Sequence, residues 1–265
     1  MTANDRAFDL LRAVVAAPSP QGLGELVVSS GLTKPTVRRL LVALDRLGFV
    51  RQDAKRRYVA GAGILDLAAA ALERIDLAGE AQEVLAGLRT TMAGTVALSE
   101  YVDGRLVVVS TLAPNGPYKV AGRGVTNTGL HATATGKAVL AFLPAADTVW
   151  LLGNNPLERY TEHTLADITA LRGQLREIAG LGFAINDQES RAGVRCIAAP
   201  VRNHLARPVA VVSVSVAAAQ VSVAALCKHS AQLMEAADAI SDGIGGPRLG
   251  NCVAGGSESG ESDQR

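Results

Sequence analysis

The sequence contains few cysteines, no long apolar run and no sign of a cleaved leader. Its three cysteines, Cys196, Cys227 and Cys252, are scattered and lack metal-ligand spacing, which argues against both a disulfide framework and a zinc site. The sequence has no run of about 18 uninterrupted apolar residues, the length that a membrane-spanning helix needs. The first residues include acids where a signal peptide has bases before an apolar core. We therefore expect a cytoplasmic protein with reduced thiols, no metal or other cofactor, and no membrane contact.

A complete phosphate-binding loop is also missing. Residues 129–142, GLHATATGKAVLAF, contain a Gly-Lys pair at Gly136 and Lys137. However, His131 stands where such a loop needs its first glycine, and Ala138 stands where a Ser or Thr would hold magnesium. A nucleotide is therefore not expected. The stretch instead predicts the start of an apolar helix, whose unpaired N–H groups can receive another kind of anion.

Charge is distributed unevenly along the chain. The formal net charge is +1, but residues 1–60 hold ten Lys and Arg against five Asp and Glu, whereas residues 61–265 hold sixteen against twenty. Such asymmetry favours a nucleic-acid-binding head on a neutral or acidic body. An ordinary solvated basic face is the alternative that charge alone leaves open.

The first sixty residues have the pattern of a small helical domain with a β-hairpin. Apolar residues three and four apart predict helices near residues 8–15, 23–27 and 34–47. Pro35 fits the first turn of the third helix, where its missing N–H would have no helical partner. Residues 49–59 predict two short strands around a polar turn. This combination is typical of a winged helix-turn-helix, whose third helix enters the major groove of double-stranded DNA while the wing follows the backbone.

The candidate DNA-binding residues lie at the exposed start of the third helix and in the wing: Lys34, Thr36, Arg38, Arg39, Arg51, Lys55, Arg56 and Arg57. Basic side chains on the helix can reach the edges of DNA bases, whereas basic side chains on the wing mostly contact phosphates. A small helical interaction domain that binds no DNA is the alternative.

The rest of the chain predicts an α+β domain with an antiparallel sheet. Two apolar runs joined by Asp103-Gly104 predict a β-hairpin, and three more strands are expected within residues 183–216. Intervening helices, expected on one side of the sheet, are predicted at 133–143, 165–179 and 221–240. The whole chain then has four parts: a winged helix-turn-helix at 1–60, a linker helix at 61–76, the sheet domain at 77–242 and a disordered, Gly- and Ser-rich tail at 243–265.

Four stretches together resemble the IclR family of bacterial transcriptional regulators: GLTKPTVRRLLVALDRLGFV, GLHATATGKAVLAF, GFAINDQESRAGVRCIAAPV and VAVVSVSV. The similarity runs from about residue 7 to residue 240, with the C-terminal motifs in family order and spacing. The resemblance implies a sequence-specific DNA-binding regulator with a GAF/profilin-like effector-binding domain. It also implies a homodimer or a dimer of dimers, and a small-molecule effector that is usually an organic acid or an aromatic catabolite.

The same resemblance implies where the effector, expected to be a carboxylate, binds. The candidate effector-binding residues line one loop and three strands: Ala134, Thr135, Gly136, Asn186, Val194, Cys196, Ser213 and Ser215. Residues two apart on a strand face the same side, which agrees with the pairs at 194 and 196 and at 213 and 215. Some family members carry an acid at the position of Asn186, and an Asn can donate to a carboxylate that an Asp would repel.

A metabolic enzyme or sensor with an accessory winged helix is the competing hypothesis. In it, Cys196 and His131 would form the nucleophile and base of a hydrolase, although a lone strand Cys is typically a small buried hydrophobe. His131 could equally form a local hydrogen bond. Lys137 could meet an anion or point to solvent, and Trp150 could pack in the core or at an interface.

Overall fold

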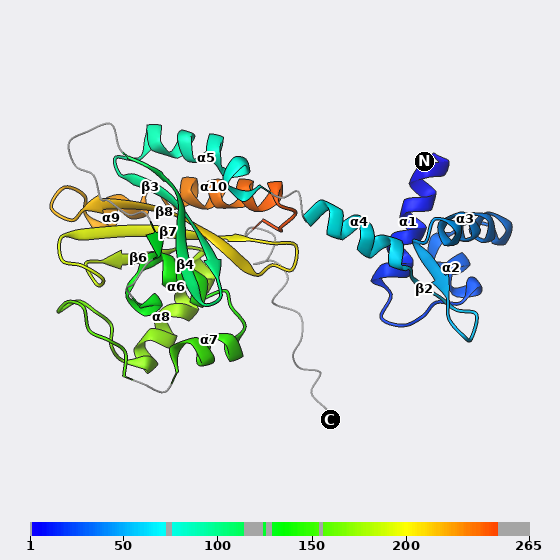
Figure 1. Ribbon diagram of the computed structural model, residues 1–265, viewed down its shortest axis with the longest axis horizontal. Coiled ribbons are helices and arrows are strands. Elements are labelled where there is room, and N and C mark those ends of the chain that lie inside the picture. The colour runs from blue at the N-terminus through cyan, green and yellow to red at the C-terminus, as the bar shows by residue number, and fades with distance from the viewer. Residues whose placement is uncertain (1, 73–75, 114–123, 126–128, 154–155, 249–265) are drawn as a thin grey trace, which may run out of the picture. The chain divides into compact units, whose positions relative to one another are not determined.

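The computed structural model describes residues 2–72, 76–113, 124–125, 129–153 and 156–248 of the 265-residue chain (Figure 1). The chain divides into two compact units, Met1–Ile75 and Asp76–Arg265. Cys252 and most of the predicted tail lie outside the described residues. No helix in the described part is long and apolar enough to cross a membrane.

The N-terminal unit is a winged helix-turn-helix, as its sequence predicts. Its elements are α1 (Ala3–Ala16), α2 (Leu23–Ser30), α3 (Lys34–Arg46), β1 (Val50–Gln52), β2 (Tyr58–Ala60) and α4 (Ala62–Leu72). The first three helices and the wing enclose one apolar core that includes Leu10, Leu26 and Leu41. β1 and β2 pair antiparallel, and Gln21 adds a bridge to Tyr58.

The linker helix α4 starts from a close backbone contact with the end of α3. Gly48 O accepts a hydrogen bond from Gly63 N at 2.9 Å. A Cβ at Gly61 would lie 2.1 Å from the same carbonyl oxygen. Only glycine fits such a contact, so the sequence G-A-G at 61–63 fixes where α4 leaves the wing.

The C-terminal unit is built around one antiparallel sheet. Its elements are α5 (Leu77–Thr91), β3 (Thr95–Val102), β4 (Arg105–Leu112), β5 (Gly124–Val125), the 3₁₀ helix η1 (Leu130–Ala132), α6 (Ala134–Leu140), α7 (Ala145–Leu152), α8 (Ile168–Leu181), β6 (Ala184–Asp187), β7 (Val194–Arg202), β8 (Pro208–Ala217), α9 (Val223–Cys227) and α10 (Ser230–Gly243). The strand order is β5-β4-β3-β8-β7-β6, and every neighbouring pair is antiparallel. The predicted α+β class is therefore confirmed.

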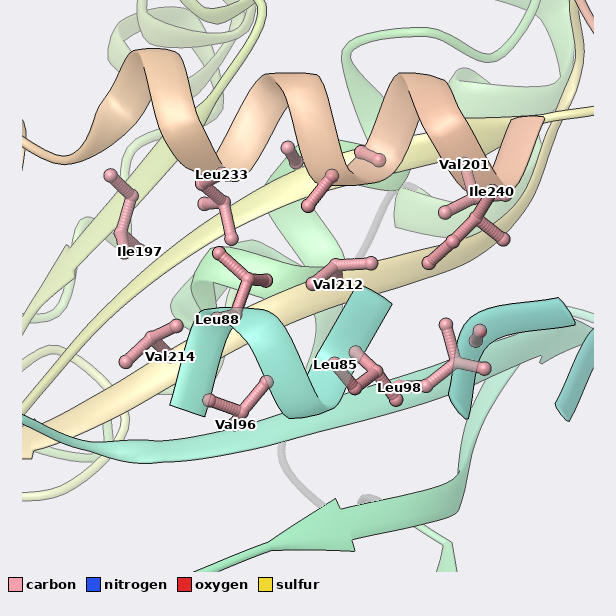
Figure 2. Packing of buried hydrophobic residues seen from close by; sticks show 14 of the residues in the cluster. Leu85, Leu88, Val96, Leu98, Ile197, Val201, Val212, Val214, Leu233 and Ile240 are labelled. Carbon is pink, nitrogen blue, oxygen red and sulfur yellow. The ribbon is translucent and has the colours of Figure 1, made fainter. Parts of the chain in front are cut away.

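Helices cover both faces of this sheet, so the expectation of helices on one side is wrong. α5 and α10 lie on one face and α6 and α8 on the other (Figure 1). Figure 2 shows Leu88 and Leu233 packed with Val212 on the first face. The reason lies in β8, where consecutive residues such as Val211 and Val212 are both fully buried. A strand that is apolar on both sides needs cover on both sides.

Two expectations about the elements have clear outcomes, and one element was not expected. The Asp103-Gly104 hairpin is confirmed, with positive φ of 48° and 77° at these residues, as a tight two-residue turn requires. The single helix expected at 221–240 is wrong, because α9 ends at Cys227 and α10 begins at Ser230. The short strand β5 was missed.

The predicted disordered tail begins too early. Ile244 is buried in the core of the C-terminal unit. Arg202 Nη2 donates to Pro247 O at 2.7 Å, which fastens the chain just beyond α10. Residues 243–248 therefore belong to the folded unit, since buried apolar area and a charge-assisted hydrogen bond outweigh the high glycine content of this segment.

Candidate nucleic-acid interface and ligand site

The outer face of α3 carries basic side chains. Val37, Leu41 and Leu44 of this helix are buried, and the opposite side leaves Arg38 and Arg39 exposed. Lys34 is exposed in the first turn. Thr36 is half-buried, and its hydroxyl lies 2.9 Å from that of Thr33. Two arginines and one lysine thus remain free to meet a polyanion, whereas the Thr36 hydroxyl already has a protein partner.

The wing presents three further basic side chains, one on β1 and two on the turn that Asp53 holds. Asp53 Oδ1 accepts from Lys55 N at 2.9 Å and from Arg57 N at 2.8 Å. Arg56 has a positive φ of 58° at the turn. Arg51, Lys55 and Arg56 are exposed. Because these bonds fix the backbone of the turn, little backbone conformational entropy is left to lose on binding.

Arg57 differs from the other wing bases because it is already paired. Its Nη2 lies 2.9 Å from Glu25 Oε2 and 3.2 Å from Glu25 Oε1. The same carboxylate accepts from Gly22 N at 2.6 Å. That backbone N–H, followed by the charge of Arg57, holds the pKa of Glu25 below its ordinary value. The guanidinium thus joins the wing to the start of α2.

In the C-terminal unit, strand register brings the predicted effector residues onto one face. Asn186 pairs with Cys196, and Cys196 pairs with Ser215. Two residues further along β7, Ala198 pairs with Ser213, so Ser213 faces the same side as Ser215. Val194 faces the same side, since it is also two residues from Cys196. α6 packs over this face against β6, β7 and β8.

At the start of α6, fewer backbone N–H groups are free to bind a ligand than the sequence suggests. Gly136 N donates to the N-cap hydroxyl of Thr133 at 3.0 Å. A Cβ at Gly136 would lie 2.2 Å from Leu130 O, so glycine is needed here for η1 to pack on α6. Among the described residues, no partner is found for the N–H groups of Ala134 and Thr135 in the first turn. Ala134 is buried and Thr135 half-buried.

The Asn186 side chain holds a turn. Its Oδ1 accepts from Glu189 N at 2.8 Å, and its Nδ2 donates to Ser190 Oγ at 2.7 Å. The residue is buried. One amide hydrogen is left for a ligand, so the contribution of Asn186 to recognition is smaller than its residue type suggests.

Cys196 is a buried thiol beside both serines. Burial raises its pKa to about 11, and the hydroxyls of Ser215 and Ser213 and the charge of Lys137 offset only part of this effect. His131 is engaged elsewhere, because its Nε2 donates to Glu158 O at 2.9 Å. A protonated thiol without a base is a poor nucleophile.

We expect Cys196 to react with a thiol reagent about 100-fold more slowly at pH 8 in the native protein than in urea. A pKa raised from 9.0 to about 11 lowers the thiolate fraction by roughly that factor. The measurement uses a Cys227→Ser/Cys252→Ser background, so that one thiol remains. Equal rates in the native and unfolded protein would contradict the raised pKa, and a faster native rate would show that Cys196 is an activated thiol.

A buried ion pair lies behind this face, and sequence reasoning missed it. Lys137 Nζ donates to Glu189 Oε1 at 2.6 Å and to Gln174 Oε1 at 3.1 Å. The Lys137 side chain is 0% exposed, so the expectation that it could point to solvent is wrong. Burial lowers the pKa of Lys137, and Glu189 partly restores it. The sequence does indicate this burial, because α6 is apolar on all sides and has no solvent-exposed face for a lysine.

Trp150 does not pack in the core. It lies on α7 and is 78% exposed. The core alternative for this residue is therefore wrong, and a role at an interface stays a prediction.

Comparison with known proteins identifies the family. A model described as the IclR helix-turn-helix domain matches residues 3–54, and one described as the C-terminal part of the bacterial transcriptional regulator IclR matches residues 69–242. The second match alone covers more than half of the chain. The chain therefore belongs to the IclR family of transcriptional regulators, which bind DNA through the N-terminal helix-turn-helix.

Curated relatives align over nearly their whole length. A probable transcriptional regulator, SauR of Cupriavidus necator, is 29% identical over 234 residues, which cover 88% of this chain and 93% of the relative. The HTH-type transcriptional regulator XynR of Escherichia coli is 30% identical over 254 residues, 92% of this chain and 97% of the relative. These families and relatives are regulators, so the chain is a regulator rather than an enzyme, and the hydrolase hypothesis is wrong.

Solved structures of the same family share the fold. A putative IclR transcriptional regulator from Silicibacter superimposes with a TM-score of 0.74 at 26% identity, covering 93% of this chain and 97% of the other. HmgR of Pseudomonas aeruginosa gives 0.67 at 25% identity, covering 93% and 99%. The arrangement of head and sheet domain along the chain is thus common to these proteins.

Proposed function

We propose that this regulator binds its operator as a homodimer, or as a dimer of dimers, and that a small carboxylate bound in the C-terminal unit controls its activity. One observation carries the effector part. Donors from three separate segments, namely Ser213 and Ser215 on β8, Cys196 on β7 and the start of α6, share one face of the sheet. Convergent polar groups in an otherwise apolar surround are typical of a small-molecule site.

The charge of this site suits an anion. Hydroxyls of Ser213 and Ser215 can donate, and the free N–H groups of Ala134 and Thr135 point from the start of α6. The Lys137 ammonium lies close enough to influence the pKa of Cys196. Its partner Glu189 balances most of this charge, so hydrogen bonds rather than net charge would hold the carboxylate.

We expect Ser215→Ala to weaken effector binding by about 1.5–3 kcal/mol, because it removes a hydrogen bond to a charged acceptor. Thr135→Leu should have a larger effect, since the added volume fills the space beside the helix start. Operator affinity without effector should stay nearly unchanged in both variants, because the substitutions lie in the other unit. Calorimetry with a carboxylate found by a thermal-shift screen provides the measurement.

Ser110→Ala is the matched control for this experiment. Ser110 pairs with Leu98, whose side chain lies in the core on the α5 side, so its loss should leave effector binding intact. Undiminished binding in both Ser215→Ala and Thr135→Leu would return the face beneath α6 to a packing role.

We also propose that basic side chains on α3 and on the wing have different roles in DNA binding. Arg39→Ala should weaken operator binding by about 1–3 kcal/mol while sparing unrelated DNA, because a helix arginine can read a base edge. Arg56→Ala should weaken both DNAs alike and reduce the salt slope by about one unit, because it removes a phosphate contact. Fluorescence anisotropy at several salt concentrations separates the two outcomes.

Arg207→Ala serves as the control, since Arg207 is exposed in the C-terminal unit. It should change neither affinity. If Arg39→Ala lowers affinity for operator and unrelated DNA equally, α3 is not the reading helix.

Dimerisation is proposed from the surface of α4. Leu65 and Leu67 are 71% and 61% exposed, and Asp66 is the only charged residue of the helix. A helix that is apolar all round is stable only when a partner covers it. Two winged helix-turn-helix units would also bind two half-sites. One unit alone contacts too little DNA for regulatory affinity. We therefore infer that α4 of a second copy provides the cover.

A further inference from the structure

The C-terminal unit contains a cavity away from the candidate effector site. It has a volume of about 330 Å³ and lies between the β3–β4 turn, η1 and residues 151–152 and 156–160. No candidate effector-binding residue lines it. Leu106 in its wall pairs with Tyr101 near the end of β3, whereas Ser215 pairs with Thr95 at the start of that strand. The two places therefore lie at opposite ends of β3.

Opposite charges line this cavity. Arg105 and Glu158 both contribute to the wall and both are exposed. In the described part of the chain, no carboxylate lies within ion-pair distance of the Arg105 guanidinium. Each charge is therefore available to a ligand, and together they leave the cavity without net charge.

Hydrogen bonds fix the acidic side of the wall. Gly129 N donates to the Tyr160 hydroxyl at 2.8 Å, and that hydroxyl donates to Glu158 Oε2 at 2.8 Å. His131 Nε2 donates to the backbone O of Glu158 at 2.9 Å. One Glu158 oxygen, Oε1, has no hydrogen-bond partner among the described residues. The carboxylate is thus oriented by the protein while retaining room for one more donor.

The rest of the wall is aliphatic. Leu106 is fully buried, and Leu151, Leu152 and Leu157 are half-buried. The exposed apolar area of the three half-buried leucines would be removed from water by a ligand with an aliphatic body. A cavity of this size is in the range of small-molecule sites.

We propose that this cavity binds a free aliphatic α-amino acid. The ligand carboxylate pairs with Arg105, its ammonium group with Glu158, and its side chain packs on the leucines. A carboxylate without an ammonium group would face the Glu158 charge without compensation, and an amine without a carboxylate would leave Arg105 unpaired. Gly129 and His131 precede Thr133, the N-cap of α6, so an occupied cavity restrains the segment that leads to the candidate effector site. The proposal does not depend on the proposed function.

Calorimetry on the full chain with three matched probes tests the ligand class. The probes are L-leucine, 4-methylpentanoate, which lacks the ammonium group, and 3-methylbutylamine, which lacks the carboxylate. L-leucine should bind, and each partial ligand should bind about tenfold or more weakly. Absence of L-leucine binding at millimolar concentration, or equal binding of either partial ligand, would overturn the proposal.

Variants then locate the bound ligand. Arg105→Gln and Glu158→Gln should each weaken L-leucine binding by about tenfold or more, and their exposed positions allow both proteins to fold with unchanged melting temperature. Ser215→Ala is the control and should bind L-leucine as tightly as the parent. If Ser215→Ala abolishes L-leucine binding while Arg105→Gln preserves it, the ligand sits under α6 and the cavity assignment is wrong.

Discussion

Replacement of Lys137 by Met is expected to destabilise the C-terminal unit by about 3–5 kcal/mol. The substitution leaves the Glu189 carboxylate buried without its cationic partner, and an uncompensated buried charge is among the most destabilising changes that a core can undergo. Lys137 Nζ lies 2.6 Å from Glu189 Oε1, and the lysine side chain has no exposed area. Urea unfolding monitored by circular dichroism measures the loss.

The double variant Lys137→Met/Glu189→Leu separates charge from packing. Replacing both partners of a buried ion pair by apolar residues is often neutral or stabilising, so most of the lost stability should return. A single variant as stable as the parent would mean that Lys137 is not buried. A double variant no better than the single would mean that the effect arises from packing rather than from the ion pair.

Local patterns predicted much of this fold because the relevant physics is local. The Asp103-Gly104 turn needs only residues that tolerate positive φ, and the strands at 194–202 and 208–217 are visible as apolar runs. The two-residue period of strands places Val194 and Cys196 on one side of β7, and Ser213 and Ser215 on one side of β8. Such inferences require no knowledge of distant contacts.

Sequence patterns did not reveal the environments of three residues. Lys137 is buried because Glu189, 52 residues later, accepts its hydrogen bond. Arg57 is paired because α2 brings Glu25 beside the wing, 32 residues earlier in the sequence. Leu47 falls within the apolar periodicity that predicts a helix at 34–47, but it is exposed, because α3 ends at Arg46. Helical periodicity carries no information about any of these three environments.

Charge on α4 is expected to reduce operator affinity by about a thousandfold. Leu65→Glu/Leu67→Glu would place like charges on the surface that we propose as the dimer seam, and separated heads could no longer bind two half-sites together. The size of the loss follows from the gap of at least about 10³ between specific and non-specific DNA binding. Light scattering at micromolar concentration and anisotropy titration on operator DNA measure assembly and affinity in one protein preparation.

Leu205→Glu is the matched control for this double variant. Leu205 is also exposed, but it lies in the turn between β7 and β8. It should leave both mass and operator affinity unchanged. A parent protein that is monomeric at micromolar concentration yet binds operator with full affinity would remove the dimer from the proposal.

Operator titration with and without effector tests most directly whether DNA binding is controlled through the C-terminal unit. The full chain would be titrated against its own upstream DNA and a scrambled sequence of equal length, in the absence and presence of the carboxylate that stabilises it in the thermal-shift screen. We predict specific binding with a steep negative salt slope, and a change in operator affinity of roughly 5- to 150-fold on addition of the carboxylate. Thr135→Leu should bind the operator but lose that change. The same weak affinity for both DNAs, or an operator affinity that the carboxylate leaves unaltered, would contradict the proposed control.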